Sequence, residues 1–138
     1  MDLTPPMPLA RRVHRIVGAV TLLAFLATGA YMRFGYHGMA GVEMATRITF
    51  RTRHLFILGA ALVHLALGAY LTPAATGRRR AWQTVGSGLL CLAAPPLILA
   101  FFVDPFAPGY RTELSSLGLY ALLAGTLLHV LAAGRGAS

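Results

Sequence analysis

No charged side chain interrupts residues 114–133, LSSLGLYALLAGTLLHVLAA. As a helix rising about 1.5 Å per residue, this run crosses a hydrocarbon core of about 30 Å. A bilayer holds no water to pair with exposed backbone groups, so a helix is the conformation that satisfies them. The run therefore predicts a transmembrane helix.

Three further apolar runs have similar lengths. They predict transmembrane spans over about residues 12–32, 54–71 and 82–103. The first is longer than the apolar region of a signal peptide and lacks a small-x-small cleavage site, so we expect it to be a retained span. The loops around the third span are short, which makes neighbouring helices antiparallel. Residues 1–138 thus predict one domain, an all-α integral membrane protein with a four-transmembrane-helix up-down bundle.

Two segments carry local signals. Charged and apolar residues alternate over residues 42–53, which predicts one or two interfacial helical turns before the second span. Pro95 and Pro96 lie inside the third span, where we expect them to kink the helix or end its first half.

Composition supports the membrane class. The chain is 57% hydrophobic and 12% charged, whereas soluble domains average about 25% charged residues. All twelve basic residues are arginine and the net charge is +8. Arginines at the ends of apolar runs contact lipid phosphates, so the charge does not indicate nucleic-acid binding. Arginine without lysine indicates a GC-rich bacterial genome, and hence the bacterial inner membrane.

The arginines also predict orientation. Seven lie on the side that carries both termini and the second loop: Arg11, Arg12, Arg15, Arg78, Arg79, Arg80 and Arg135. Five lie on the other side: Arg33, Arg47, Arg51, Arg53 and Arg111. Because arginine is enriched on the cytoplasmic side, we expect an N-in/C-in topology.

Small and polar residues share one face of each predicted span. In chain order the four faces are His14, Gly18, Thr21, Phe25 and Thr28; His54, Ile57, Ala61, His64 and Gly68; Thr84, Ser87, Cys91 and Ala94; and Gly118, Leu122, Gly125, His129 and Ala132. Small residues allow helices to approach closely, so we expect these faces to meet inside the bundle. Cys91 is the single cysteine, which excludes an internal disulfide, and reads as a small apolar helix residue.

Three histidines fall at similar depth near the cytoplasmic end. His64 and His129 form the best pair of axial ligands for a b-type haem, with His14 nearby. Arg12, Arg15 and Arg78 to Arg80 would then face the haem propionates, and Gly68, Gly118 and Gly125 would make room for the ring. The same histidines could instead bind copper or zinc. A third alternative is structural, with the histidines hydrogen-bonding serine or threonine across helices.

A second candidate site lies at the outer end. Arg47, Arg51 and His54 share a helix face with Arg53 adjacent, and this row predicts contact with a lipid phosphate, a quinone head group or an acidic partner. Interfacial arginines that merely anchor a span are the alternative.

No catalytic motif is recognisable, so the sequence predicts no catalytic residue. We expect a non-catalytic accessory or structural subunit of a larger membrane complex, in contact with lipid and with other subunits or its own copies. A b-type haem protein that transfers electrons or handles haem is the first alternative, and it requires His64 and His129 to face each other across a gap. A small oligomeric transporter or channel is the second, and it requires a polar pathway through the bundle.

Overall fold

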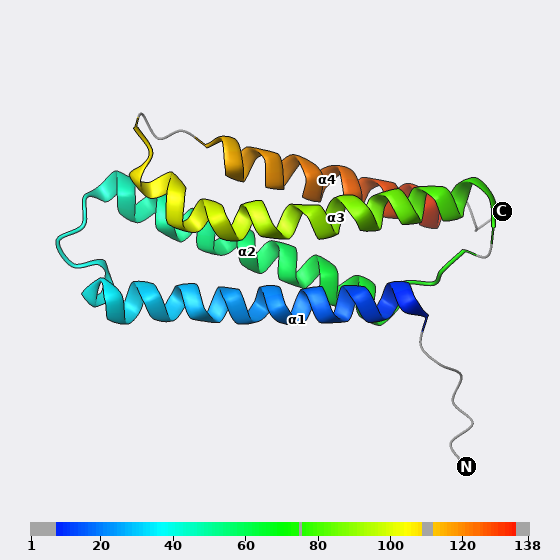
Figure 1. The fold of residues 1–138 in the computed structure, drawn as a ribbon, viewed down its shortest axis with the longest axis horizontal. Helices are drawn as coiled ribbons and strands as arrows, with labels where there is room; N and C mark the ends of the chain where they lie inside the picture. The colour runs from blue at the N-terminus through cyan, green and yellow to red at the C-terminus, as the bar shows by residue number, and fades with distance from the viewer. Residues whose placement is uncertain (1–7, 75, 109–111, 135–138) are drawn as a thin grey trace, which may run out of the picture.

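The computed structural model describes residues 8–74, 76–108 and 112–134 (Figure 1). Four long helices account for most of them: α1 (Leu9–Ala30), α2 (Met44–Tyr70), α3 (Gly77–Val103) and α4 (Glu113–Gly134). Each is long and apolar enough to cross a membrane. Within the described ranges no strand occurs. The predicted all-helical fold with four candidate spans is therefore confirmed.

The helices run alternately in opposite directions (Figure 1). α1 packs mainly along α2, and α3 packs mainly along α4. α2 and α3 join these two antiparallel pairs, while α1 and α3 touch only sparsely. The start of α1 and the end of α4 lie at the same end of the bundle (Figure 1), which we call the first end. The opposite end holds the connections from α1 to α2 and from α3 to α4, and we call it the second end.

The helices α1, α2 and α3 begin before the expected spans, at Leu9, Met44 and Gly77 rather than at about 12, 54 and 82. α2 begins at Met44, so residues 44–53 belong to one continuous helix with the second span. α3 runs through Pro95 and Pro96 without ending. Proline is tolerated inside a helix whose neighbours re-satisfy the freed backbone groups. Short helical turns at Tyr31–Gly35, His37–Met39 and Asp104–Phe106 complete the second end.

The predicted inward faces of α1, α2 and α4 are confirmed. Their buried members are His14, Gly18, Thr21 and Thr28; Ile57, Ala61, His64 and Gly68; and Gly118, Gly125, His129 and Ala132. The face predicted for α3 is confirmed in part, since Ala94 is buried and Ser87 and Cys91 are half-buried, but the most buried residues lie mainly one position earlier. Gln83, Gly86, Leu90, Ala93 and Leu97 are buried there, whereas Thr84 is exposed.

Glycines on α4 explain the shift. A Cβ atom on Gly118 would lie 2.6 Å from Leu97 Cγ, and one on Gly125 would lie 2.7 Å from Leu90 Cγ and 2.8 Å from the carbonyl oxygen of Gly86. Leucines of α3 therefore fill the space above glycines of α4. This packing, rather than the polarity of α3, selects the face that is buried.

Replacing Gly125 with Ala should lower the free energy of unfolding by about 1–3 kcal/mol, the usual cost of overpacking. The added methyl group meets backbone of α3 as well as Leu90, so the two helices must separate. Gly88→Ala is the matched control, because nothing lies within 4 Å of a Cβ there. The control should be neutral or stabilising by up to about 1 kcal/mol. Thermal unfolding in mild detergent measures both, and equal midpoints would contradict the packing described.

The outer surface is apolar on every helix. Leu23, Leu62, Leu92 and Tyr120 are 64%, 55%, 70% and 72% exposed, and they represent a larger set of exposed Leu, Val, Ile and aromatic side chains on all four helices. A soluble monomer rarely exposes a contiguous apolar patch beyond several hundred Å². The protein thus exposes many large apolar side chains along all four helices.

A buried ion pair connects α2 to the turn after α3 at the second end. The Nε atom of Arg53 donates to Oδ2 of Asp104 at 2.7 Å, and the two side chains are 10% and 3% exposed. Phe50, Ile57, Phe101 and Met39 form a buried apolar cluster in the same half of the bundle.

Candidate metal centre

Three histidines from three helices meet near the first end. His14 comes from α1, His64 from α2 and His129 from α4, and their exposed fractions are 0%, 0% and 7%. Each lies on the face that its helix turns toward the bundle interior. The structure thus brings together the three histidines that the sequence singled out.

His14 lies at the centre of this cluster. Its Nδ1 atom is 2.9 Å from Nδ1 of His64. Its ring centroid is 5.0 Å from that of His64 and 5.8 Å from that of His129. The sequence favoured His64 with His129 as the pair, but the direct contacts run through His14.

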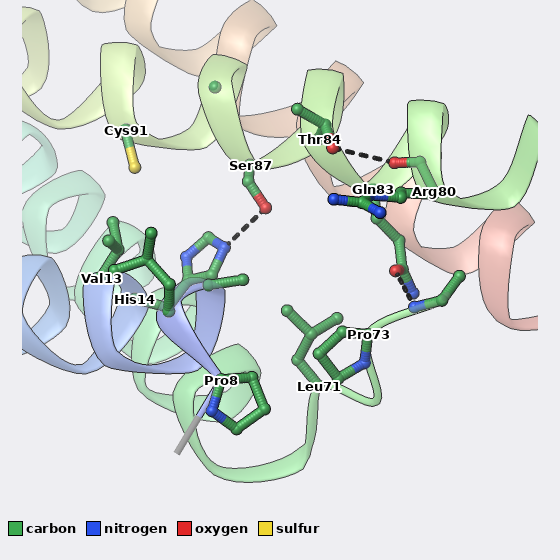
Figure 2. Close-up of a pocket in the computed structure, with 14 residues that line it drawn as sticks. Pro8, Val13, His14, Leu71, Pro73, Arg80, Gln83, Thr84, Ser87 and Cys91 are labelled. Atoms are coloured by element: carbon green, nitrogen blue, oxygen red, sulfur yellow. Dashed lines mark hydrogen bonds between the residues drawn. The ribbon is translucent and has the colours of Figure 1, made fainter. Parts of the chain in front are cut away.

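α3 supplies the polar partners. Oγ of Ser87 lies 2.9 Å from Nε2 of His14 and 3.2 Å from Nε2 of His129. Nε2 of His64 donates to the carbonyl oxygen of Leu90 at 3.1 Å. Figure 2 shows the hydrogen bond from Ser87 to His14, with the Cys91 sulfur projecting from α3 toward the same part of α1. The cluster therefore draws on all four helices.

Cys91 completes a set of metal-binding donors. Ligand atoms of His14, His64 and Cys91 all lie within 4.8 Å of one another. On a tetrahedral ion, two imidazole nitrogens lie about 3.3 Å apart, and a nitrogen and a thiolate sulfur about 3.6 Å. An ion between the two Nδ1 atoms therefore requires them to separate by about 0.4 Å while the Cys91 side chain moves inward. No pattern in the sequence indicates this role, because spacing along α3 does not reveal which residues of α1 and α2 lie beside Cys91.

A cavity of about 660 Å³ reaches this donor set. It lies between α1, α3 and the connection from α2 to α3, and His14, Ser87 and Cys91 are among its lining residues (Figure 2). Val13, Leu71 and Pro73 contribute apolar walls, and Gln83 secures the connection by donating to the Thr72 carbonyl at 3.0 Å. The cavity thus borders Cys91 and the His14 residue, while the His14 ring itself is fully buried against His64 and Ser87.

The surroundings fit a haem poorly. Two axial imidazoles must hold the iron and the macrocycle between them. In the predicted pair, His64 contacts His14 and the Leu90 carbonyl through its two ring nitrogens, and Nε2 of His129 lies against Ser87. The space beside Gly118 and Gly125 is filled by Leu97 and Leu90, and that beside Gly68 by Arg15.

The arginines at the first end also have other contacts. Arg11 and Arg15 donate to the carbonyl of Gly68, which caps the C-terminal end of α2. Arg78 lies over the ring of Trp82 at 4.7 Å. These three guanidinium groups thus already contact other parts of the protein, two of them at the end of α2 and one at an aromatic ring.

The outer row does not form one surface. Arg51 is exposed, Arg47 is half-buried and donates to the Val42 carbonyl, and Arg53 is buried against Asp104. His54 turns toward α1, where its ring stacks on Phe25 at 4.0 Å and its Nδ1 lies 2.9 Å from Oγ1 of Thr28. Of the four residues, Arg51 is the clearest candidate for contact with a lipid head group. The Arg53 side chain is too buried for such a contact.

No family model, curated protein or solved structure matched the chain. The function is therefore argued from the histidine cluster itself.

Proposed function

We propose that this protein is a multi-pass protein of the bacterial inner membrane that binds one copper(I) ion through His14, His64 and Cys91. The observation that carries the proposal is the meeting of two imidazole nitrogens at 2.9 Å with a thiol close by, deep in a bundle with an apolar exterior. Imidazole and thiolate are ligands that suit copper and zinc.

Membrane insertion is supported by the surface of the four helices, whose exposed side chains are large and apolar. The arginine count supports an N-in/C-in topology, with the histidine cluster near the cytoplasmic end. A fluorescent protein that folds only in the cytoplasm should therefore fluoresce when fused after residue 138. A fusion in the loop at residue 40 should stay dark, and a bright loop fusion with a dark C-terminal one would reverse the topology.

Charge favours copper(I) over zinc. A thiolate and a singly charged ion form a neutral centre, whereas a doubly charged ion leaves one positive charge in a poorly solvated interior, which is costly. Among the described residues the three acids, Glu43, Asp104 and Glu113, all lie at the second end and cannot offset that charge. Arg11 and Arg15 lie in the first two turns of α1, at the same end as the cluster, and add further positive charge.

The cavity supports exchange of the ion rather than permanent burial. A structural metal site is closed by protein ligands, whereas a working site keeps one side open. Half-buried Cys91 lines the 660 Å³ cavity together with His14, so an ion that enters the cavity meets the Cys91 thiol first and reaches the buried His14 ring from there. The proposed role is thus holding or passing on copper within the membrane.

Titration of the purified protein with copper(I), in competition with a coloured copper(I) chelator under anaerobic conditions, tests the proposal. One equivalent should be withdrawn from the chelator, and zinc should compete weakly. The variant His37→Ala is a control, because His37 lies exposed in the loop between α1 and α2. The proposal fails if the protein withdraws no more copper(I) than the detergent alone.

A role as an accessory subunit remains a second proposal, favoured by one feature of α3. Thr84, Gly88 and Pro95 lie exposed on α3, with Thr84 and Gly88 also lining the 660 Å³ cavity beside α1, and small residues such as Thr84 and Gly88 suit close contact with another helix. Gly88→Leu should then reduce co-purification with a partner or self-association, measured after cross-linking in the membrane. A transporter is less well supported, because apolar Ile57, Leu97 and Phe101 fill the centre of the described bundle.

A further inference from the structure

The hydrogen bonds of the cluster form one chain with a defined direction. The Leu90 carbonyl can only accept, so His64 carries its proton on Nε2. A neutral His64 then has a lone pair on Nδ1, and His14 must donate to it from its own Nδ1. A charged imidazole would be costly in this interior, so neutral rings are the consistent assignment.

The same reasoning continues through Ser87 to His129. Nε2 of neutral His14 has the lone pair, so the Ser87 hydroxyl donates to it. That hydroxyl has one proton, so Oγ of Ser87 must accept from Nε2–H of His129. His129 is left with a lone pair on Nδ1, and Nδ1 of His129 is one of two buried side-chain atoms in the described chain without a hydrogen-bond partner.

An ion between His14 and His64 is incompatible with the hydrogen bond that His14 Nδ1 donates to His64. The ion needs a lone pair on Nδ1 of both rings, and His64 already supplies one. His14 must move its proton to Nε2 and donate it to Ser87, so Ser87 must turn and donate to His129. Nε2 of His129 then becomes an acceptor and its proton resides on Nδ1.

We infer that Ser87 and His129 are positioning residues for the metal site, because reversal of the His14–Ser87–His129 chain sets the tautomer in which His14 can bind the ion. The inference rests on the copper(I) site proposed for His14, His64 and Cys91. The three histidines hold the same number of protons before and after, and only the Cys91 thiol proton leaves, through the adjoining cavity. In the metal-loaded protein Ser87 thereby accepts a hydrogen bond from Nε2 of His14, just as the Leu90 carbonyl accepts one from Nε2 of His64. Each of these acceptors orients a ligand through the ring nitrogen that does not bind the ion.

Reversal also changes what His129 presents to its surroundings. The Cδ2 side of its ring packs against Gly86 of α3 and Nε2 faces Ser87, so the edge carrying Nδ1 faces away from Gly86. His129 lines a second cavity of about 300 Å³, together with Leu67, Thr72 and Arg79. In the metal-loaded protein the His129 Nδ1–H becomes a donor, so binding of the ion in the first cavity changes the hydrogen-bonding character of a residue that lines the second.

Nitrogen-15 NMR of histidine-labelled protein in micelles tests the inference, since copper(I) and zinc are both diamagnetic. Protonated and unprotonated ring nitrogens resonate far apart, so the tautomer of His129 can be read directly, with assignment by His129→Asn. Addition of copper(I) should move the His129 proton from Nε2 to Nδ1. If copper(I) binds with one equivalent and His129 keeps its tautomer, the inference is wrong while the metal site stands.

The variants Ser87→Ala and Ser87→Thr distinguish a positioning role of the Ser87 hydroxyl from a purely structural role of the residue. Ser87→Ala removes the hydroxyl, so copper(I) affinity should fall by about 10–100-fold, the usual effect of removing a partner of a metal ligand. His129 should then no longer respond to the ion. Ser87→Thr keeps a hydroxyl and should restore both the affinity and the response. Equal behaviour of the two variants would overturn the inference, and failure of the wild-type protein to bind copper(I) would instead overturn the metal site.

Discussion

Replacing His14 with Gln should lower the affinity for copper(I) by more than about 100-fold, beyond the loss that follows removal of a partner of a metal ligand. His14 is fully buried and touches both His64 and Ser87. An amide can take over hydrogen bonds at this position, so the variant should fold. It offers only a weakly basic oxygen or nitrogen in place of the imidazole lone pair.

His54→Gln is the matched control for this change. His54 is also a histidine inside a helix of the bundle, but it lies toward the second end, against Thr28 and Phe25. The same chelator competition measures both variants. His54→Gln should bind copper(I) as the unaltered protein does. If both variants bind equally well, the ion does not lie between His14 and His64.

Replacing Arg53 with Ala should lower the free energy of unfolding by about 3–5 kcal/mol, the cost of leaving one member of a buried ion pair without its partner. The Asp104 carboxylate is 3% exposed and receives the Arg53 guanidinium at 2.7 Å. Without Arg53, that charge remains in an apolar setting. SDS titration from mild detergent micelles measures the effect.

Two further variants give this prediction its controls. Arg51→Ala removes an exposed arginine two residues earlier in the same helix, and it should change the free energy of unfolding by less than about 0.5 kcal/mol. The double variant Arg53→Met with Asp104→Leu removes both charges and should recover most of the loss. A double variant no more stable than Arg53→Ala would show that the loss comes from packing rather than from the unpaired charge.

The fold was largely predictable because the apolar runs are long and their small and polar residues repeat at helical spacing. The inward faces of α1, α2 and α4 followed from that spacing. That of α3 followed only in part, since its most buried face is set by Gly118 and Gly125 on α4, which accept Leu97 and Leu90. A choice between two faces of one helix depends on the shape of its neighbour, and the spacing within α3 does not contain that information.

The candidate site was predictable in part, for a similar reason. Depth along the spans brings His14, His64 and His129 to one level, which the sequence shows. Which two rings touch depends on helix rotation, and His14 proved to lie at the centre. Cys91 and Ser87 were predicted to face the interior, but their contact with His14 and His64 required the position of α3 relative to α1. The pairing of Arg53 with Asp104 is another contact between distant segments that no local pattern indicates.

The most direct measurement is X-ray absorption at the copper K edge of the purified protein loaded with one equivalent of copper(I). With copper(I) bound by His14, His64 and Cys91, the edge should be typical of copper(I) with low coordination, and the first shell should hold two imidazole nitrogens and one sulfur. The sulfur contribution should disappear in Cys91→Ser. A first shell of nitrogen and oxygen alone in the unaltered protein, or one unchanged in Cys91→Ser, would contradict the site.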